Sequence, residues 1–222
     1  LSLSGMMELP ACIVLAQRPG PATGLPTRTG QQDLQFVLRS GHGEFPRAVC
    51  AAGTHEEAYK LTRKALETAH KYQSPAIILM DQFLMDCQRN IPELDIFLKP
   101  IDRHIVEEPD EDYVRYSPAD DGVSPRALPG SEACVVSDSD EHNEIGHITE
   151  DFDTRIAMQD KRMRKEKGML EDWISPVRYG PEDAERVLVT WGSTYMPARE
   201  AVASLDGESP STALVHFPQV YP

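Results

Sequence analysis

The sequence predicts an α/β protein built on a parallel β-sheet, and three observations support this prediction. Short apolar runs flanked by proline or glycine occupy residues 11–16, 47–51 and 76–80, which is typical of strands in a parallel sheet. A helical pattern lies between the second run and the third, so these segments form a β-α-β unit within one sheet. A further strand signal at residue 187 begins a second unit of the same kind.

The first apolar run leads into an arginine and a loop rich in glycine and proline. Cys12–Leu15 has the composition of a strand buried on both faces. In open α/β sheets, ligands bind beyond the carboxyl ends of the strands, where Arg18 is the first charged residue. A guanidinium offers a planar fork of donors that suits a carboxylate or a phosphate. The loop therefore predicts a site for an anionic ligand.

The helix between the second and third runs has a clear start and an apolar face. Thr54 and Glu57 match the T-x-x-E capping box, which marks a helix N-terminus. The residues that follow on one face at helical spacing are Ala58, Leu61, Thr62, Ala65, Leu66, Ala69 and Tyr72. We expect this helix to cover one face of the sheet.

From about residue 89 the composition changes to acidic clusters and repeated prolines, which predicts an extended interdomain connection over residues 101–182. Within it, residues 155–170 form a predicted helix with Ile156, Met163 and Leu170 at heptad spacing. Its other faces carry Lys161, Arg162, Arg164, Lys165 and Lys167. We expect these basic residues to face solvent or an acidic partner.

The strand signal returns at VLVTW (187–191), and a helix over residues 197–205 and a strand over residues 214–217 follow it. Pro197 suits the first turn of a helix. The predicted organisation is therefore residues 1–100 as one α/β domain, residues 101–182 as the connection, and residues 183–222 as the start of a second α/β domain.

Composition excludes several classes of protein. The chain has 36 acidic and 22 basic residues, and a formal net charge of −14 argues against nucleic acid as a partner. The four cysteines form no C-x-x-C pair, so the sequence predicts neither an iron–sulfur cluster nor a structural zinc site. It also indicates no catalytic cysteine, and the cysteine usage fits a reducing cytoplasm. No apolar run approaches the roughly 20 residues that span a bilayer. The chain starts without methionine and stops after a strand, so we expect a fragment of a longer protein.

Two groups of polar residues are candidates for the site. The first is Arg18 with Gly20, Thr23 and Gly24, where small residues allow close approach of a ligand; the alternative is an arginine that only bonds carbonyls within the turn. The second possible active-site group comprises Gln31, Gln32, Asp33, His42 and Glu44. His42 either transfers a proton or bonds a backbone carbonyl.

The segment at residues 140–147 gathers acidic residues and two histidines. Asp140, Glu141, His142, Glu144 and His147 are metal-ligand types, but their spacing lacks the i, i+4 geometry of H-E-x-x-H. A structural or intersubunit loop is therefore favoured over a metal site.

Several of these motifs together resemble one enzyme family. QRPGPATGLPT, TGQQDL, GHGEFPR, DQFLMD, GVSPRALPG, DEHNEIGHITED and VLVTWGS are similar to segments of the alpha subunit of thiamine-diphosphate-dependent 2-oxoacid:ferredoxin oxidoreductases, with the 2-oxoglutarate enzyme closest. The resemblance implies the rear of a pyrimidine-binding domain, then the start of a domain like the carboxyl-terminal domain of transketolase. It also implies that Arg18 binds the carboxylate of the 2-oxoacid.

The resemblance further implies an oxidative decarboxylation that yields an acyl-CoA and reduced ferredoxin, with 2-oxoglutarate as the expected substrate and coenzyme A as the acyl acceptor. Thiamine diphosphate and Mg²⁺ are expected mainly on a beta subunit, and an iron–sulfur cluster on a partner subunit, with possible gamma and delta subunits. No catalytic residue is expected within these 222 residues, so the chain alone should be inactive. The alternative is a noncatalytic α/β module that binds an anion or serves assembly.

Overall fold

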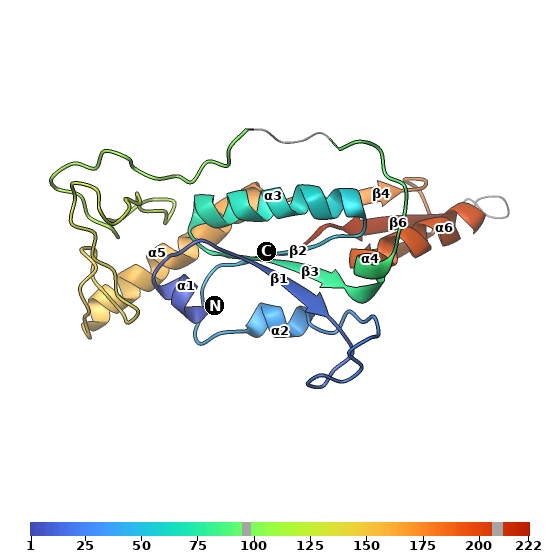
Figure 1. Cartoon of the computed structure of the whole chain (residues 1–222), viewed down its shortest axis with the longest axis horizontal. Coiled ribbons are helices and arrows are strands. Elements are labelled where there is room, and N and C mark those ends of the chain that lie inside the picture. Colours follow the sequence, from blue (N-terminus) through green and yellow to red (C-terminus); the bar gives the residue numbers. More distant parts are fainter. Residues whose placement is uncertain (95–98, 206–210) are drawn as a thin grey trace.

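Two β-sheets form the frame of the molecule, and the computed structural model describes residues 1–94, 99–205 and 211–222 (Figure 1). The first sheet has the strand order β1-β3-β2-β7. Its strands are β1 (Ala11–Gln17), β2 (Ala48–Ala51), β3 (Pro75–Asp81) and β7 (Gln219–Tyr221). The second sheet has the order β4-β6-β5. Its strands are β4 (Val177–Tyr179), β5 (Arg186–Trp191) and β6 (Thr212–Phe217).

The predicted α/β fold with a parallel sheet is confirmed. Strand β3 pairs in parallel with β1, in the register Ala11 to Pro75, and also with β2, in the register Ala48 to Ala76. The three strands therefore end at the same edge of the sheet, and their carboxyl ends lie together.

Helices cover both faces of the first sheet (Figure 1). Helix α3 (His55–Tyr72) lies on one face, and the short helices α1 (Ser2–Met6) and α2 (Leu34–Arg39) lie on the other. The central strand β3 serves both layers, because Ile77 and Leu79 pack with α2 while Ala76 and Ile78 pack with α3. This alternation explains why β3 has an unbroken apolar run.

Helix α3 begins at the predicted cap. The N–H of Glu57 donates to Oγ1 of Thr54 at 3.1 Å. The carboxylate of Glu57 accepts from the N–H of Gly53 at 2.8 Å. In a standard capping box it would accept from the N–H of the cap residue itself, which here is Thr54. Leu61, Ala65, Ala69 and Tyr72 are buried as predicted, whereas Thr62 is exposed.

The prediction that Cys12–Leu15 is buried on both faces was wrong. Strand β1 lies at the edge of the first sheet and pairs only with β3. Ile13 and Val14 are exposed, with 37% and 60% of their surface open. An apolar run cannot reveal whether a strand is central or at an edge, because both positions favour the same residue types.

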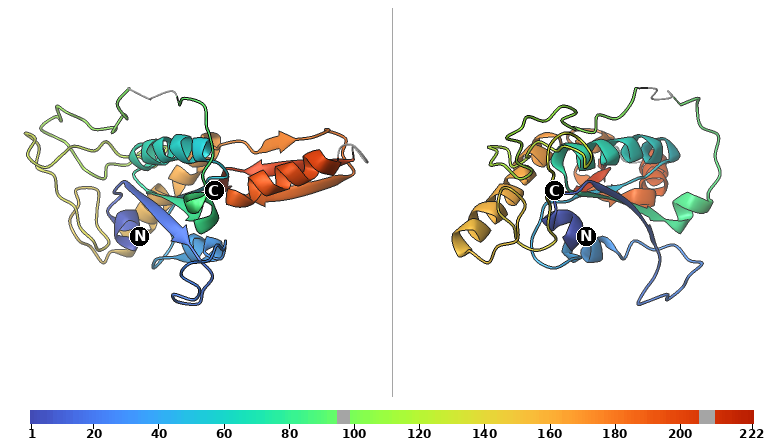
Figure 2. Two further views of the ribbon diagram at one scale, coloured as in Figure 1. Left: turned by 45° about the vertical axis from the view of Figure 1, so that its right-hand side comes forward. Right: turned by 60° about the vertical axis from the view of Figure 1, so that its left-hand side comes forward.

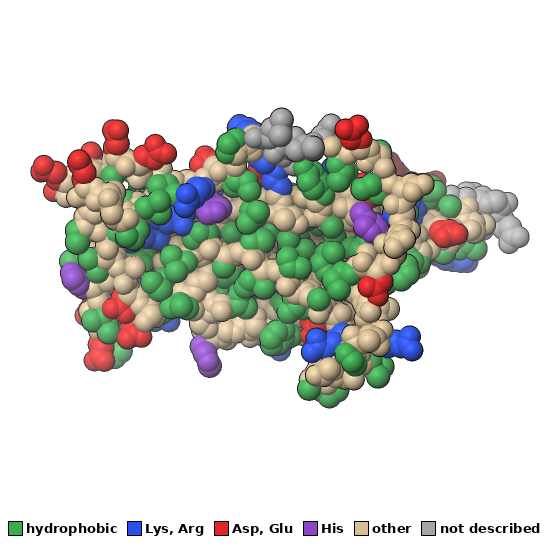
Figure 3. All heavy atoms as spheres, in the orientation of Figure 1, with side chains coloured by type: hydrophobic (Ala, Val, Ile, Leu, Met, Phe, Trp, Pro, Cys, Tyr) green, Lys and Arg blue, Asp and Glu red, His purple; other side chains and the backbone are tan. Residues whose placement is uncertain are grey.

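A long segment follows α4 (Gln82–Asp86) and precedes α5 (Phe152–Glu171). Among its described residues, isolated bridges join Ile105 to Arg126 and His142 to Ile148, with no longer strand. The segment is nevertheless anchored, because Tyr116 is fully buried and its hydroxyl donates to the carbonyl of Met7 at 3.1 Å. The red side chains at the upper left of Figure 3 lie over this segment.

Helix α5 lies within the predicted connection and packs against the first sheet's layer of helices. The hydroxyl of Tyr72 in α3 donates to the carbonyl of Gly168 in α5 at 2.7 Å. A side chain at residue 168 would meet the ring of Tyr72 at 2.8 Å, so glycine permits this close approach. The division into residues 1–100, 101–182 and 183–222 stays a prediction.

The expected orientation of α5 was wrong. Lys161, Arg162 and Lys165 are almost completely buried, whereas Ile156 and Leu170 of the heptad pattern are 60% and 53% exposed. Of the predicted basic residues, Arg164 and Lys167 do face solvent. The helix therefore turns much of its basic side toward the protein and much of its apolar side outward.

Buried acidic groups explain this orientation. Glu8, which is fully buried just before β1, accepts from Nζ of Lys161 at 2.7 Å and lies 2.5 Å from Nζ of Lys165. Glu141 receives two parallel hydrogen bonds from the guanidinium of Arg162, at 3.0 and 2.8 Å. Paired charges of this kind are tolerated in an interior where single charges are not.

The charges in the Glu8 cluster shift the pKa values of its members. Burial raises the pKa of Glu8, but Lys165 and Lys161 outweigh burial and hold it at about 2. Burial, together with the nearby charge of Lys161, lowers the pKa of Lys165 to about 8, and Glu8 offsets only part of this shift. The carboxylate is thus the group on which both lysines depend.

The second sheet has the predicted elements. Strands β5 and β6 pair in parallel, and α6 (Tyr195–Leu205) with the short helix η1 (Gly192–Thr194) joins them. Figure 2 shows this sheet and α6 extending to one side of the first sheet. The chain then returns, because β7 pairs antiparallel with β2 of the first sheet. Among the described helices, none has both the length and the apolar character that a bilayer crossing requires.

We predict that removing the Glu8 carboxylate destabilises the fold strongly. Glu8→Gln leaves two buried ammonium groups without their counter-charge, and breaking a buried pair in this way costs about 3–5 kcal/mol. Urea unfolding of the whole chain measures the loss. Glu171→Gln, which changes an exposed acid at the end of α5, is the control and should cost less than about 0.5 kcal/mol. Equal effects of the two variants would contradict the role of the cluster.

The same carboxylate predicts how stability depends on pH. The pKa of Glu8 is lowered from 4.5 to about 2 in the folded protein, so the unfolded chain binds more protons between these values. Its contribution is present above about pH 4.5 and is lost as the pH falls toward 2. The difference in unfolding free energy between the wild type and Glu8→Gln should therefore narrow from pH 6 to pH 3. A difference that stays constant would show that Glu8 does not titrate in this range.

Candidate functional site

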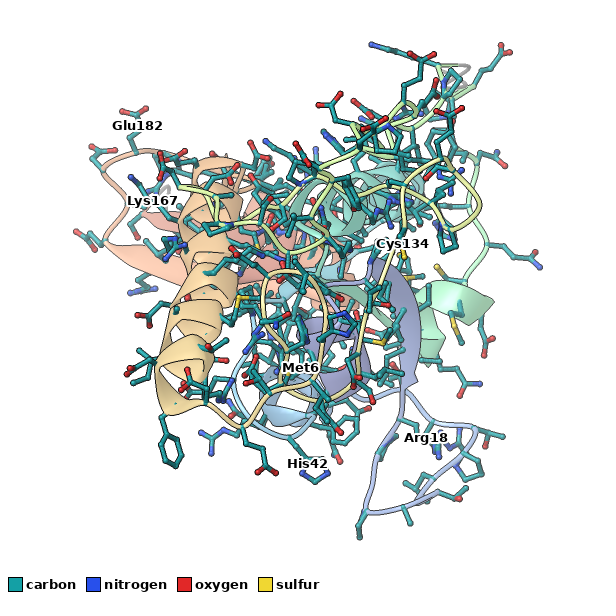
Figure 4. All side chains as sticks on the ribbon, turned by 90° about the vertical axis from the view of Figure 1, so that its left-hand side faces the viewer. Met6, Arg18, His42, Cys134, Lys167 and Glu182 are labelled. Carbon is teal, nitrogen blue, oxygen red and sulfur yellow. The ribbon has the colours of Figure 1, made fainter. Side chains whose placement is uncertain are left out.

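The candidate site lies at the carboxyl end of β1, where the chain enters the loop of residues 18–33. Figure 4 shows Arg18 at the base of this loop, which projects away from the body of the molecule. The loop is held to the protein at its base: the side chain of Gln17, which is buried, accepts from the N–H of Asp33 at 3.4 Å. The position of Arg18 is thus defined by the end of a strand.

Hydrogen bonds within the loop define its shape. The N–H of Leu25 donates to the carbonyl of Pro19 at 3.0 Å, and the N–H of Gly20 donates to the side-chain oxygen of Gln32 at 2.9 Å. Gly24 has a φ of +50°, and a Cβ there would lie 1.9 Å from the carbonyl oxygen of Pro19. Residue 24 must therefore be glycine for the loop to close on itself.

Arg18 is exposed and lines an open pocket of about 620 Å³. Its Nε donates to the carbonyl of Thr23 at 3.0 Å, and this is the one hydrogen bond of the guanidinium among the residues that the structure describes. The pocket is lined by Leu15, Ala16, Arg18, Gly20, Pro21, Ala22, Gln32, Asp33 and Phe36. One edge of the guanidinium thus serves the turn, while its other nitrogens are available to an anionic ligand.

The structure brings together only some of the predicted site residues. Arg18, Gly20, Gln32 and Asp33 line the same pocket. Thr23 and Gly24 shape the loop but do not line that pocket. Asp33 precedes α2, yet its carboxylate makes no capping hydrogen bond, so the side chain is free to face the pocket.

His42 and Glu44 lie elsewhere. Both line a different pocket of about 420 Å³, which Arg155 and Gln159 of α5 also line. The N–H of His42 is bound by the hydroxyl of Ser2, and the carbonyl of Glu44 accepts from Gln159 at 2.9 Å. Figure 4 shows His42 below Met6 and apart from the loop that carries Arg18. Proximity in sequence to the Arg18 loop did not place these two residues beside it.

A polar junction that the sequence analysis did not single out joins the two sheets. The hydroxyl of Ser193, at the carboxyl end of β5, donates to the carboxylate of Asp81, at the end of β3, at 2.6 Å. The same carboxylate accepts from the N–H of Leu84 at 3.1 Å and so caps α4. Both Asp81 and Ser193 are buried. Strand β3 of the first sheet and strand β5 of the second therefore approach each other at their carboxyl ends, next to the Arg18 loop.

A second contact between the sheets involves a buried histidine. His216 of β6 is fully buried, stacks on the ring of Tyr195 at 4.2 Å and lies 3.0 Å from the carboxylate of Glu57. Glu57 also holds the N–H of Gly53. A Cβ at residue 53 would lie 2.9 Å from the ring of His216, so the close approach needs glycine. The T-x-x-E pattern pointed to Glu57 only as a helix cap, since its partner lies 159 residues away.

Contacts within the protein hold the histidine- and acid-rich segment at residues 140–147. His142 is fully buried, stacks on Tyr116 at 4.0 Å and bonds the carbonyl of Asp140 at 2.9 Å. Glu141 binds Arg162 and Arg155 of α5. In the described part of the chain, no group of three or more His, Cys, Asp or Glu residues is placed to hold a metal ion.

The two cysteines in strands of the first sheet, Cys12 and Cys50, behave as small apolar residues. Cys50 lies buried in β2, and burial raises the pKa of its thiol to about 12. Cys12 is half-buried in β1, and burial also raises the pKa of its thiol. Thiols with raised pKa values are poor nucleophiles at neutral pH.

Comparisons with known proteins agree with the motifs. The family described as "Pyruvate flavodoxin/ferredoxin oxidoreductase, thiamine diP-bdg" matches residues 1–161. The chain is 44% identical over 200 residues to "2-oxoacid:ferredoxin oxidoreductase 1, subunit alpha" of Sulfurisphaera tokodaii, covering 87% of this chain and 32% of that protein. It is 30% identical over 227 residues to "2-oxoglutarate oxidoreductase subunit KorA" of Mycobacterium tuberculosis, covering 100% of this chain and 34% of that protein. The chain thus spans about a third of the length of these relatives.

A solved structure has the same fold. The 2-oxoglutarate:ferredoxin oxidoreductase from Magnetococcus marinus, with 2-oxoglutarate, coenzyme A and succinyl-CoA bound, superposes with a TM-score of 0.89 at 32% sequence identity. The match covers 100% of this chain and 39% of that chain.

We predict that Gly24→Ala opens the Arg18 loop. The added Cβ collides with the carbonyl of Pro19, and the positive φ adds strain. Hydrogen–deuterium exchange of the peptide containing residues 18–30 should become faster. Gly43→Ala is the matched control, because Gly43 has a φ of +70° with open space around its Cβ position. Unchanged exchange of the loop in Gly24→Ala would show that the observed turn is not required.

Proposed function

The chain belongs to the thiamine-diphosphate-binding domain family of the 2-oxoacid:ferredoxin oxidoreductases, and on that premise we propose that it serves an alpha subunit of such an enzyme. The proposed reaction is the oxidative decarboxylation of a 2-oxoacid, with reduction of ferredoxin and transfer of the acyl group to coenzyme A. The chain covers only a third of its relatives, so this activity is proposed for the complete assembly.

One observation carries the role of this chain in that reaction: Arg18 lines an open pocket at the carboxyl end of a parallel strand. Its Nε is used by Thr23, which holds the guanidinium plane, and its remaining nitrogens are available to bind the carboxylate of the substrate. A carboxylate held in this way has a defined orientation, which aims the neighbouring keto carbon at a nucleophile. Arg18 thus binds and orients the substrate.

The choice of 2-oxoacid is a finer proposal. 2-Oxoglutarate is supported by the names of the Mycobacterium tuberculosis relative and the Magnetococcus marinus structure. The relatives with 44% identity carry the broader name 2-oxoacid:ferredoxin oxidoreductase. We therefore propose a 2-oxoacid as the substrate class, with 2-oxoglutarate as the first member to test.

Thiamine diphosphate would supply the carbanion chemistry of the reaction. Its diphosphate is held through Mg²⁺ by oxygen ligands, and the described residues lack a cluster of acidic side chains placed for a metal ion. The described residues of this chain therefore do not by themselves form a binding site for the diphosphate and its metal ion. We assign Mg²⁺ and the diphosphate mainly to a beta subunit. An iron–sulfur cluster is likewise proposed for a partner subunit, as are contacts with ferredoxin and with gamma or delta subunits.

We predict that Arg18→Gln raises the KM of the assembled enzyme for its 2-oxoacid. A hydrogen bond to a charged group contributes about 1.5–3 kcal/mol, which corresponds to roughly a 10- to 150-fold change in KM. Steady-state reduction of ferredoxin by the assembly, with 2-oxoglutarate and pyruvate compared, measures the effect.

Arg28→Gln is the control for that experiment. Arg28 is an exposed arginine of the same loop that does not line the pocket, so its loss should leave KM within about twofold. A normal KM in Arg18→Gln would contradict the substrate role and favour the noncatalytic anion-binding or assembly module.

A further inference from the structure

The side chain of Gln31 joins the Arg18 loop to the second sheet. Nε2 of Gln31 donates to the carbonyl of Trp191, the last residue of β5, at 2.9 Å. The two residues are 160 positions apart. Gln31 is half-buried, whereas nearly all of residues 18–29 are exposed.

Gly192 allows this contact. A Cβ at residue 192 would lie 2.7 Å from Nε2 of Gln31, and Gly192 has a φ of +62°. Any other residue at this position would displace the amide of Gln31. The end of β5 is therefore shaped to receive that amide.

The acceptor end of the tie is rigid. Ser193 holds the carboxylate of Asp81 at 2.6 Å, and both side chains are buried. The carbonyl of Trp191 also accepts from the hydroxyl of Thr194 at 2.8 Å. Gln31 thus binds to a point that is fixed by other bonds and that stays hydrogen-bonded if Gln31 is replaced.

The donor end of the tie adjoins the pocket. Gln32, the next residue, accepts from the N–H of Gly20 at 2.9 Å, and both residues line the pocket with Arg18. A contact at Gln31 therefore restricts the two sides of the loop that face the ligand. A series of contacts therefore connects Asp81 and Ser193, through Gln31 and Gln32, to the segment that carries Arg18.

We propose that Gln31 is a positioning residue that holds the Arg18 loop in its ligand-binding conformation by anchoring it to the end of β5. This inference rests on the proposed function, since it acts through the substrate role of Arg18. Restricting the loop before binding lowers the entropy that substrate binding must otherwise cost. The second sheet thereby contributes to substrate affinity without touching the substrate.

The test replaces Gln31 with methionine, which has a similar length and no N–H donor. The loss of one neutral hydrogen bond, about 0.5–1.5 kcal/mol, should raise the KM of the assembled enzyme for the 2-oxoacid by roughly 2- to 13-fold, with a smaller change in kcat. Gln88→Met, at an exposed glutamine outside the loop, is the matched control and should change neither constant. A variant that only destabilised the fold would lower the active fraction and leave KM unchanged.

A double mutant separates this inference from the proposed function. If Gln31 acts through Arg18, then Gln31→Met should add less than twofold to KM in an Arg18→Gln background. If the KM changes of the two single mutants instead multiplied in full in the double mutant, the inference would be overturned and the role of Arg18 would remain intact. A normal KM in Arg18→Gln alone would overturn the proposed function itself.

Proteolysis provides a measurement that does not depend on activity. Trypsin should cleave after the exposed Arg28 faster in Gln31→Met than in the wild type or Gln88→Met. Equal cleavage rates, together with an unchanged KM, would show that the loop keeps its conformation without Gln31.

Discussion

The carboxylate of Asp81 is the point on which the arrangement of the site depends. It lies at the end of the central strand β3, caps α4 through the N–H of Leu84, and accepts the hydroxyl of Ser193 from the second sheet. A buried carboxylate must have its oxygens occupied, and these two donors occupy both. The requirement fixes where the end of β5 lies relative to the first sheet, and the loop that carries Arg18 is positioned against that end.

Buried charges also hold α5 against the first sheet. The helix contributes Lys161, Lys165 and Arg162, and the carboxylates of Glu8 and Glu141 neutralise them. Glu8 lies shortly before β1, the strand that leads into Arg18, so the helix and the start of that strand are tied together. Such pairs add little net stability compared with apolar packing, but breaking one is costly, and they therefore favour one arrangement of the helix over others.

Much of the fold follows from the residue pattern. The three apolar runs, the capping box at Thr54 and the strand at residues 187–191 were all found where local preferences predict them. Arg18 was identified because a charged residue after a strand of a parallel sheet is exposed at the edge where ligands bind. The pattern failed for α5, since a heptad of apolar residues normally marks the inward face, and for His42 and Glu44, which follow the loop in sequence but face a different pocket.

Local residue preferences established the strands, the helices, the motifs that carry the family resemblance and the place of Arg18 at the start of the loop, because each of these depends on neighbours within a few positions. Contacts between distant residues established the rest. Glu8 and Lys161 are 153 positions apart, Asp81 and Ser193 are 112 apart, and Gln31 and Trp191 are 160 apart. A residue type does not reveal which distant group will neutralise or bind it, since that depends on how the whole chain packs. The inward face of α5, the junction of the two sheets and the anchor of the Arg18 loop could therefore be found only in three dimensions.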